Sequence, residues 1–163
     1  MKNKIYLSVI IPVYNEIATC AEIIKRVQAI SIVHEIIVVD DASTDGTIHI
    51  LETIDNIKVI HHEQNSGKGA AVRTGLAHVQ GNYVITQDAD LEYDPNDYLK
   101  LAEPVENGIT KVVYGSRWLN KSIEWNLHYL INQMITLFAN VFNGVFLTDI
   151  STCYKLIPTT LLQ

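Results

Sequence analysis

The sequence is poor in cysteine. Only Cys20 and Cys153 occur among 163 residues, and they lie far apart. There is no CxxC pair and no Cys/His spacing of the kind that binds zinc. These absences exclude a disulfide-stapled domain and a classical zinc module, and they are typical of a protein from a reducing compartment.

Basic residues are also scarce. Twelve lysines and arginines stand against 18 aspartates and glutamates, which gives a formal net charge of −6. This balance argues against a nucleic-acid partner, which usually meets a basic surface. Any anionic ligand must instead meet local donors or a metal ion. With 48% hydrophobic and 18% charged residues, the chain has the composition and length of one globular domain.

No leader sequence is evident at the N-terminus. The first apolar run, residues 5–11, is short and stops at Pro12, and no small-residue cleavage site follows it. We interpret this run as a first β-strand and expect a cytoplasmic protein.

Strand-like and helix-like patterns alternate along the chain. Short β-branched runs predict strands over residues 5–11, 35–40, 56–60, 83–86 and 111–114. Helical spacings separate them, as in Cys20, Ile23, Ile24 and Val27. The alternation predicts an α/β fold with a mainly parallel, Rossmann-like sheet flanked by helices.

Polar clusters follow four of these strands. They are residues 14–16, 40–41, 88–90 and 116–117. The carboxyl ends of parallel strands meet at one edge of a sheet, where ligands bind in such folds. This agreement predicts a single site at that edge.

The acids of these clusters permit two kinds of chemistry. Asp88 and Asp90 could hold a hard cation, Mg²⁺ or Mn²⁺, or they could simply cap turns. Asp41 could accept hydrogen bonds from a ribose or a base, or it could belong to a turn.

Two cations could meet an anion at the same edge. The loop over residues 65–69 lacks the GxxxxGK[ST] spacing of a phosphate loop, but it can present backbone N–H groups and Lys68 to an anion. Arg117 offers a planar fork suited to phosphate, with a surface salt bridge as the alternative.

Residues 127–147 form a strongly apolar stretch of about the length of a membrane span. Four amide residues interrupt it: Asn132, Gln133, Asn140 and Asn143. Burying these amides in hydrocarbon is costly, which disfavours a spanning helix. A core or surface helix is the default prediction, and an amphipathic helix lying on a membrane is the alternative.

Taken together, several segments resemble family 2 glycosyltransferases of the GT-A fold. They are SVIIPVYNE (8–16), EIIVVDDASTDGT (35–47), NSGKGAAVRTG (65–75), GNYVITQDADLEYDP (81–95), VVYGSRW (112–118) and TDISTCYKLIP (148–158). Within that family the resemblance is to enzymes that glycosylate dolichyl or other polyprenyl phosphates.

The resemblance implies roles for individual residues. Those expected to bind the nucleotide sugar are Pro12, Tyr14, Glu16, Val39, Asp41, Lys68, Asp88, Ala89 and Asp90. Those expected to hold Mg²⁺ or Mn²⁺ are Asp90, Asp88 and Glu92, the last at a position where relatives often carry glutamine. Arg117 would bind diphosphate or acceptor phosphate, and Asp149 would lie on the acceptor side. Asp90, Asp149 and Arg117 are the expected catalytic residues.

The implied reaction is inverting transfer of a sugar from a GDP- or UDP-sugar to an acceptor. With a polyprenyl phosphate acceptor the attacking oxygen is already anionic. With a sugar hydroxyl a general base is required, and Asp149 is the candidate. A lipid acceptor would place the protein peripherally at the inner face of the cell membrane.

Family members usually continue well beyond the TDISTCYK region, whereas this sequence ends at Gln163. We therefore expect residues 1–163 to form one catalytic domain without the usual C-terminal extension. Two other functions remain open. One is a non-catalytic nucleotide-sugar-binding subunit, and the other is a receiver-type signalling domain, which also uses acids at a sheet edge.

Overall fold

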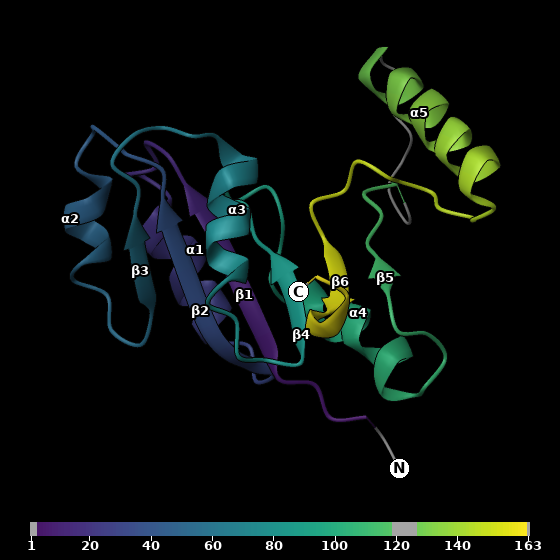
Figure 1. Ribbon diagram of the computed structural model, residues 1–163, viewed down its shortest axis with the longest axis horizontal. Helices are drawn as coiled ribbons and strands as arrows, with labels where there is room; N and C mark the ends of the chain where they lie inside the picture. Colours follow the sequence, from purple (N-terminus) through teal and green to yellow (C-terminus); the bar gives the residue numbers. More distant parts are fainter. Residues whose placement is uncertain (1–2, 119–126, 163) are drawn as a thin grey trace.

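The computed structural model describes residues 3–118 and 127–162. In these ranges, six strands form one sheet in the order β3–β2–β1–β4–β6–β5, with helices packed around it (Figure 1). The strands are β1 (Leu7–Val13), β2 (Val33–Asp40), β3 (Lys58–His61), β4 (Tyr83–Thr86), β5 (Val113–Tyr114) and β6 (Lys155–Pro158). The helices are α1 (Cys20–Gln28), α2 (Thr47–Leu51), α3 (Lys68–Leu76), α4 (Asp97–Glu106), α5 (Leu127–Asn143) and the 3₁₀ turn η1 (Thr159–Leu161).

The sheet is mainly parallel, as predicted. β1 pairs in parallel with β2 and β4, and β2 pairs in parallel with β3. The exception is β6, which runs antiparallel to both β4 and β5. The sequence pattern does not predict β6, because four residues that include a lysine and a proline show little strand pattern. The segment is a strand because it pairs with β4, with Tyr83 opposite Pro158 and Val84 opposite Ile157.

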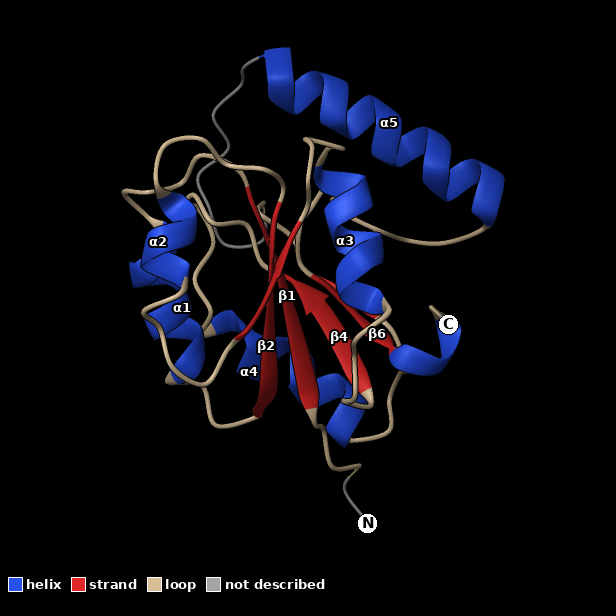
Figure 2. Ribbon diagram, turned by 60° about the vertical axis from the view of Figure 1, so that its left-hand side comes forward, coloured by secondary structure: helices blue, strands red, loops and turns tan. Residues whose placement is uncertain are grey.

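Helices cover both faces of the sheet. α1, α2 and α4 contribute to the larger core cluster, and α3 covers the opposite face (Figure 2). Cys20, Ile23, Ile24 and Val27 are all fully buried, which confirms the predicted core face of α1. α3 packs closely because Gly75 has no side chain. A Cβ there would lie 2.6 Å from Cγ2 of Ile10.

Strand β1 continues past the point where the sequence predicted its end. Pro12 pairs with Val39 within the strand. The carbonyl of Ile10 accepts the N–H of Gln87, so it points toward β4. Pro12 lies two residues further along and faces the same side, beyond the last paired residue of β4. Its missing N–H therefore breaks no ladder bond.

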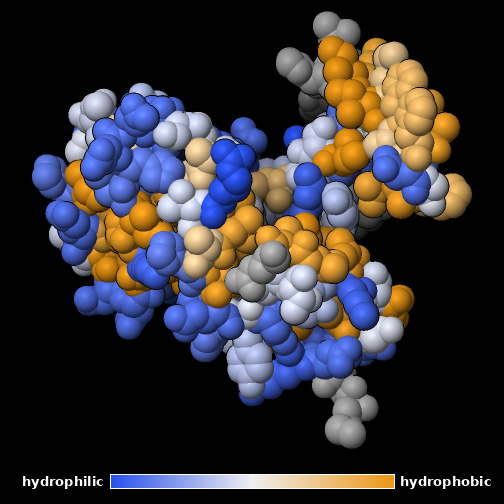
Figure 3. Space-filling model, in the orientation of Figure 1, coloured by the Kyte–Doolittle hydropathy of each residue, from blue (hydrophilic) through white to orange (hydrophobic). Residues whose placement is uncertain are grey.

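Helix α5 turns its polar side toward the rest of the chain. Asn132 and Thr136 are buried, and the Asn140 side chain exchanges hydrogen bonds with the backbone of Leu147 at 2.8 and 2.9 Å. Phe138 and Phe142 are 59% and 81% exposed. The apolar side of α5 therefore faces outward, as Figure 3 shows for this view. Along the described part of the chain, no helix has the length and apolar character needed to cross a bilayer.

Candidate active site

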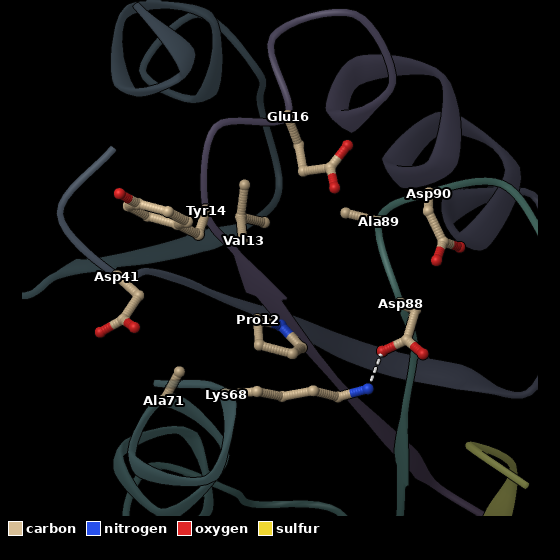
Figure 4. A pocket seen from close by; sticks show the side chains of 10 residues that line it. All are labelled: Pro12, Val13, Tyr14, Glu16, Asp41, Lys68, Ala71, Asp88, Ala89 and Asp90. Atoms are coloured by element: carbon tan, nitrogen blue, oxygen red, sulfur yellow. Dashed lines mark hydrogen bonds and ion pairs between the residues drawn. The ribbon is translucent and has the colours of Figure 1, made fainter. Parts of the chain in front are cut away.

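A pocket of about 250 Å³ opens at the carboxyl edge of the parallel strands (Figure 4). We call it the edge pocket. It is lined by Pro12, Val13, Tyr14, Glu16, Asp41, Lys68, Ala71, Asp88, Ala89 and Asp90. Except for Val39, every residue expected from the sequence to bind a nucleotide sugar lies on this lining. Segments far apart in sequence therefore meet where strand topology predicts a ligand.

Val39 is the exception. Its side chain is fully buried and packs with Ile37 and Ala71 beneath α3. The structure therefore places Val39 outside the lining of the edge pocket, and its contact with the base or ribose stays a prediction. A continuous apolar run such as residues 36–39 does not reveal which member reaches the surface, because a parallel strand is covered on both faces.

Hydrogen bonds tie the loops around the edge pocket together. The N–H of Thr44 donates to Oδ1 of Asn15 at 2.8 Å, and the N–H of Asn15 donates to Oγ of Ser43 at 2.9 Å. Asn15, Ala42 and Leu91 all have positive φ, at 56°, 63° and 65°. Such backbone is costly for residues other than glycine and clusters at functional sites. The loops after β1, β2 and β4 are thus held in a defined arrangement.

Asp41 joins the β2 edge to the start of α3. Its carboxylate accepts the N–H of Ser66 at 3.0 Å, the N–H of Gly67 at 2.7 Å and Nδ1–H of His62 at 2.6 Å. Burial by itself raises the pKa of Asp41, but these hydrogen bonds outweigh burial, and its pKa lies below the ordinary value. The carboxylate is therefore charged, and Oδ2, which holds one of these bonds, keeps a lone pair for a ligand donor.

Sequence reasoning missed the part played by His62, because the histidines show no ligand spacing. Its Nδ1 bonds Asp41, and its Nε2 lies 2.9 Å from Oγ1 of Thr74 on α3. The order of the strands in the sheet indicates this contact. β2 and β3 are neighbours, so the residues that follow them, Asp41 and His62, come to lie side by side.

Two of the three expected metal ligands share the edge pocket. Asp88 and Asp90 line it, whereas Glu92 faces a neighbouring groove. Among the described residues, no group of three or more His, Cys, Asp or Glu side chains is placed to hold a metal ion. One or two carboxylates still suit Mg²⁺ or Mn²⁺, because such ions complete their shell with phosphate oxygens and water. Asp88 and Asp90 fit that role.

A buried polar cluster supports the Asp88–Asp90 loop from below. Gln87 is fully buried, and its Oε1 accepts the hydroxyls of Tyr98 and Tyr154, each at 2.6 Å. Its Nε2 donates to the carbonyl oxygen of Asp88 at 2.9 Å. This network fixes the backbone that presents the two acids, and nothing in the sequence pattern indicated it.

Arg117 and Asp149 form a bidentate pair beside this loop. Nε of Arg117 donates to Oδ2 of Asp149 at 2.8 Å, and Nη2 donates to Oδ1 at 3.0 Å. Oδ1 also accepts Nδ2 of Asn132 at 3.0 Å, and Oδ2 accepts the Arg117 N–H at 3.2 Å. Both oxygens are therefore saturated. Burial raises the pKa of Asp149, the hydrogen bonds lower it by more, and the net pKa is below its ordinary value.

This geometry disfavours Asp149 as a general base, because its lone pairs are already occupied. Asp149 instead holds the Arg117 fork in place. The guanidinium keeps further N–H donors on its other edge. Arg117 lines a groove of about 600 Å³, which we call the Arg117 groove. Its charged lining residues are Lys68, Asp88, Glu92, Arg117 and Lys155.

Residues 8–157 match the profile described as Glycosyl transferase family 2. The chain belongs to this family. A curated relative is the undecaprenyl-phosphate 4-deoxy-4-formamido-L-arabinose transferase of Proteus mirabilis (strain HI4320), 34% identical over 146 residues. The match covers 82% of this chain and 44% of the relative, so the chain spans less than half of that enzyme.

Solved structures share the fold of this family 2 chain. Glucosyl-3-phosphoglycerate synthase from Mycobacterium tuberculosis, in complex with Mn²⁺, UDP-glucose and phosphoglyceric acid, superposes with a TM-score of 0.76. It is 24% identical, and the match covers 97% of this chain and 58% of that one. Staphylococcus aureus TarS 1–349 gives a TM-score of 0.69 at 23% identity, covering 96% and 48%. These likenesses confirm the GT-A fold, and family membership excludes the receiver domain.

Proposed function

We propose that this chain transfers a sugar from a nucleoside-diphosphate sugar to a polyprenyl phosphate at a membrane surface, with inversion at the anomeric carbon. The observation that carries the proposal is the adjacency of two sites. The edge pocket presents Asp41, Asp88 and Asp90, and the Arg117 groove shares Lys68 and Asp88 with it. A donor in the pocket and an acceptor phosphate in the groove would meet at this junction.

The proposed assignment follows the chemistry of each group. Asp41 accepts a hydrogen bond from the nucleoside, and Asp88 and Asp90 hold the divalent cation. When bound, that cation offsets negative charge on the departing nucleoside diphosphate. The free edge of Arg117 binds the acceptor phosphate. An oxygen of this phosphate forms the new bond to the anomeric carbon as the bond to the diphosphate breaks.

This reaction needs no general base, because the attacking oxygen is already anionic. The saturated carboxylate of Asp149 supports the phosphate acceptor over a hydroxyl acceptor. The curated relative, which by its name acts on undecaprenyl phosphate, supports the same acceptor class. We propose that residues 1–163 form one catalytic domain and that α5 attaches this domain to a membrane surface.

Calorimetry with UDP and GDP, with and without Mn²⁺, tests the donor side. We expect one of the two nucleotides to bind, and EDTA to weaken that binding at least about tenfold, because an unscreened diphosphate faces two carboxylates. Transfer from the matching nucleotide sugar to undecaprenyl phosphate in detergent would separate the enzyme from a non-catalytic binding subunit. Binding of neither nucleotide at any Mn²⁺ concentration would contradict the proposal.

The exposed side of α5 supplies the proposed membrane contact. Phe138 and Phe142 stack at a centroid distance of 6.4 Å and project from the chain. We expect the protein to bind neutral phosphatidylcholine vesicles in a salt-resistant manner, because apolar burial and not charge provides the attraction. The double change Phe138→Ser and Phe142→Ser should weaken binding by about tenfold or more.

Ile109→Ser serves as the control in vesicle flotation, since Ile109 is 77% exposed but lies outside α5. It should leave vesicle binding unchanged. If the wild-type protein does not bind vesicles, or if the double variant binds them as well as wild type does, the proposal that α5 contacts a membrane is wrong.

A further inference from the structure

Lys68 reaches across the floor of the edge pocket to Asp88. The lysine lies in the first turn of α3, and its Nζ pairs with Oδ1 of Asp88 at the end of β4, as the dashed line in Figure 4 marks. The two side chains are 56% and 21% exposed. Both residues line the edge pocket and the Arg117 groove, so the ion pair stands at the junction between them.

The pair occupies a carboxylate that the proposed function assigns to a metal ion. While Oδ1 of Asp88 is paired with Nζ of Lys68, it is less available to a divalent cation. The positive charges of the lysine and of the cation also repel each other. Burial lowers the pKa of Lys68, but its hydrogen bond to Asp88 and the nearby negative charges of Asp88 and Asp90 together raise it by more, and the net pKa is above the ordinary value. Lys68 therefore carries its charge at neutral pH.

A nucleoside diphosphate changes this balance. Its phosphates are stronger partners for an ammonium group than one carboxylate is, and a long lysine side chain can turn without moving α3. Once Lys68 turns to the diphosphate, both oxygens of Asp88 become available to the cation that the same diphosphate brings.

We propose that Lys68 is an internal counter-ion that occupies Asp88 until a nucleoside diphosphate displaces it, so that free divalent cation is kept out and metal and nucleotide enter together. This inference rests on the proposed function and adds an order of binding to it. In thermodynamic terms, Lys68 increases the factor by which UDP and Mn²⁺ strengthen each other's binding.

The test measures Mn²⁺ binding by electron paramagnetic resonance of the free ion, and UDP binding by calorimetry (with GDP in its place if that is the nucleotide bound). Without nucleotide, Lys68→Met should bind Mn²⁺ about fivefold more tightly than wild type, the change expected for loss of a partly exposed ion pair. With Mn²⁺ present, the same variant should bind the nucleotide about tenfold more weakly. The two affinities thus move in opposite directions, which misfolding would not produce.

Lys100→Met is the matched control. Lys100 pairs with Asp97 at 2.7 Å, and neither residue lines the edge pocket. This variant removes the same charge and frees one aspartate, and it should change neither affinity. The inference is overturned if Lys68→Met leaves Mn²⁺ binding unchanged or weaker, or if Lys100→Met tightens it equally. Failure of wild-type protein to bind either nucleotide would instead refute the proposed function, and the inference with it.

Discussion

Asp90→Ala is expected to lower the rate of sugar transfer by at least about 100-fold while leaving the fold intact. The side chain of Asp90 is exposed at the rim of the edge pocket, and its described contact is a 3.0 Å hydrogen bond from the N–H of Glu92. Loss of this hydrogen bond should change the free energy of unfolding by about 0.5 kcal/mol, as substitutions at other surface positions do. Stability and activity are thus expected to separate.

The size of the activity loss follows from charge. Glu92 faces the neighbouring groove, so Asp88 and Asp90 are the two expected metal ligands that share the pocket. Removing one of these two expected ligands should weaken the binding of a divalent cation that offsets leaving-group charge. Steady-state transfer assays and Mn²⁺-dependent nucleotide binding measure this, with urea unfolding as the check on folding.

Asp55→Ala is the matched control for Asp90→Ala. Asp55 is exposed and precedes β3, at the opposite edge of the sheet. Asp55→Ala removes the same negative charge as Asp90→Ala, and this variant should keep full activity. An Asp90→Ala protein that retains wild-type turnover and Mn²⁺ dependence would show that the metal is held elsewhere.

Arg117→Met is expected to cost about 3 kcal/mol of folding stability at pH 8, more than Asp149→Asn costs. The carboxylate of Asp149 has no exposed surface, whereas 36% of the Arg117 side chain is exposed. Removing the arginine leaves a buried charge with weaker partners. Removing the charge of Asp149 leaves an arginine that can turn to water, at a cost of about 1 kcal/mol.

The pH dependence of these costs has a definite sign. In the wild-type protein the pKa of Asp149 is lowered on folding, so its contribution is complete above the ordinary aspartate pKa of about 3.9 and is lost as pH falls through the folded value. Without Arg117, burial should raise the folded pKa instead. Stability of the variant should then be lost as pH rises, and its deficit should be smaller at pH 5 than at pH 8.

Urea unfolding of wild type, Arg117→Met and Asp149→Asn at both pH values measures these differences. Equal deficits for Arg117→Met at pH 5 and pH 8, or a larger loss in Asp149→Asn, would mean that Asp149 is not held as a buried charge. Arg117→Met should also abolish transfer to polyprenyl phosphate, which the transfer assay reports separately.

The sequence by itself determined the α/β class, the edge of the sheet that bears the site, and most residues of the edge pocket. It could do so because strand and helix periodicities are local, and because the carboxyl ends of parallel strands must meet at one edge. Tyr14, Asp41, Asp88 and Asp90 follow directly from that rule, and family 2 membership agrees with the motifs in which they lie.

Only the tertiary structure decided what each side chain contacts. It buried Val39, left Glu92 outside the edge pocket that Asp88 and Asp90 line, and saturated the carboxylate of Asp149 with donors from Arg117 and Asn132.

The structure also decided the orientation of α5. Its sequence shows an apolar and a polar side, but not which side faces inward. Hydrogen bonds to the segment over residues 147–150 turn Gln133, Thr136 and Asn140 toward the chain, and Phe138 and Phe142 are left outside. These outcomes depend on partners distant in sequence, whose hydrogen-bonding demands no local pattern records.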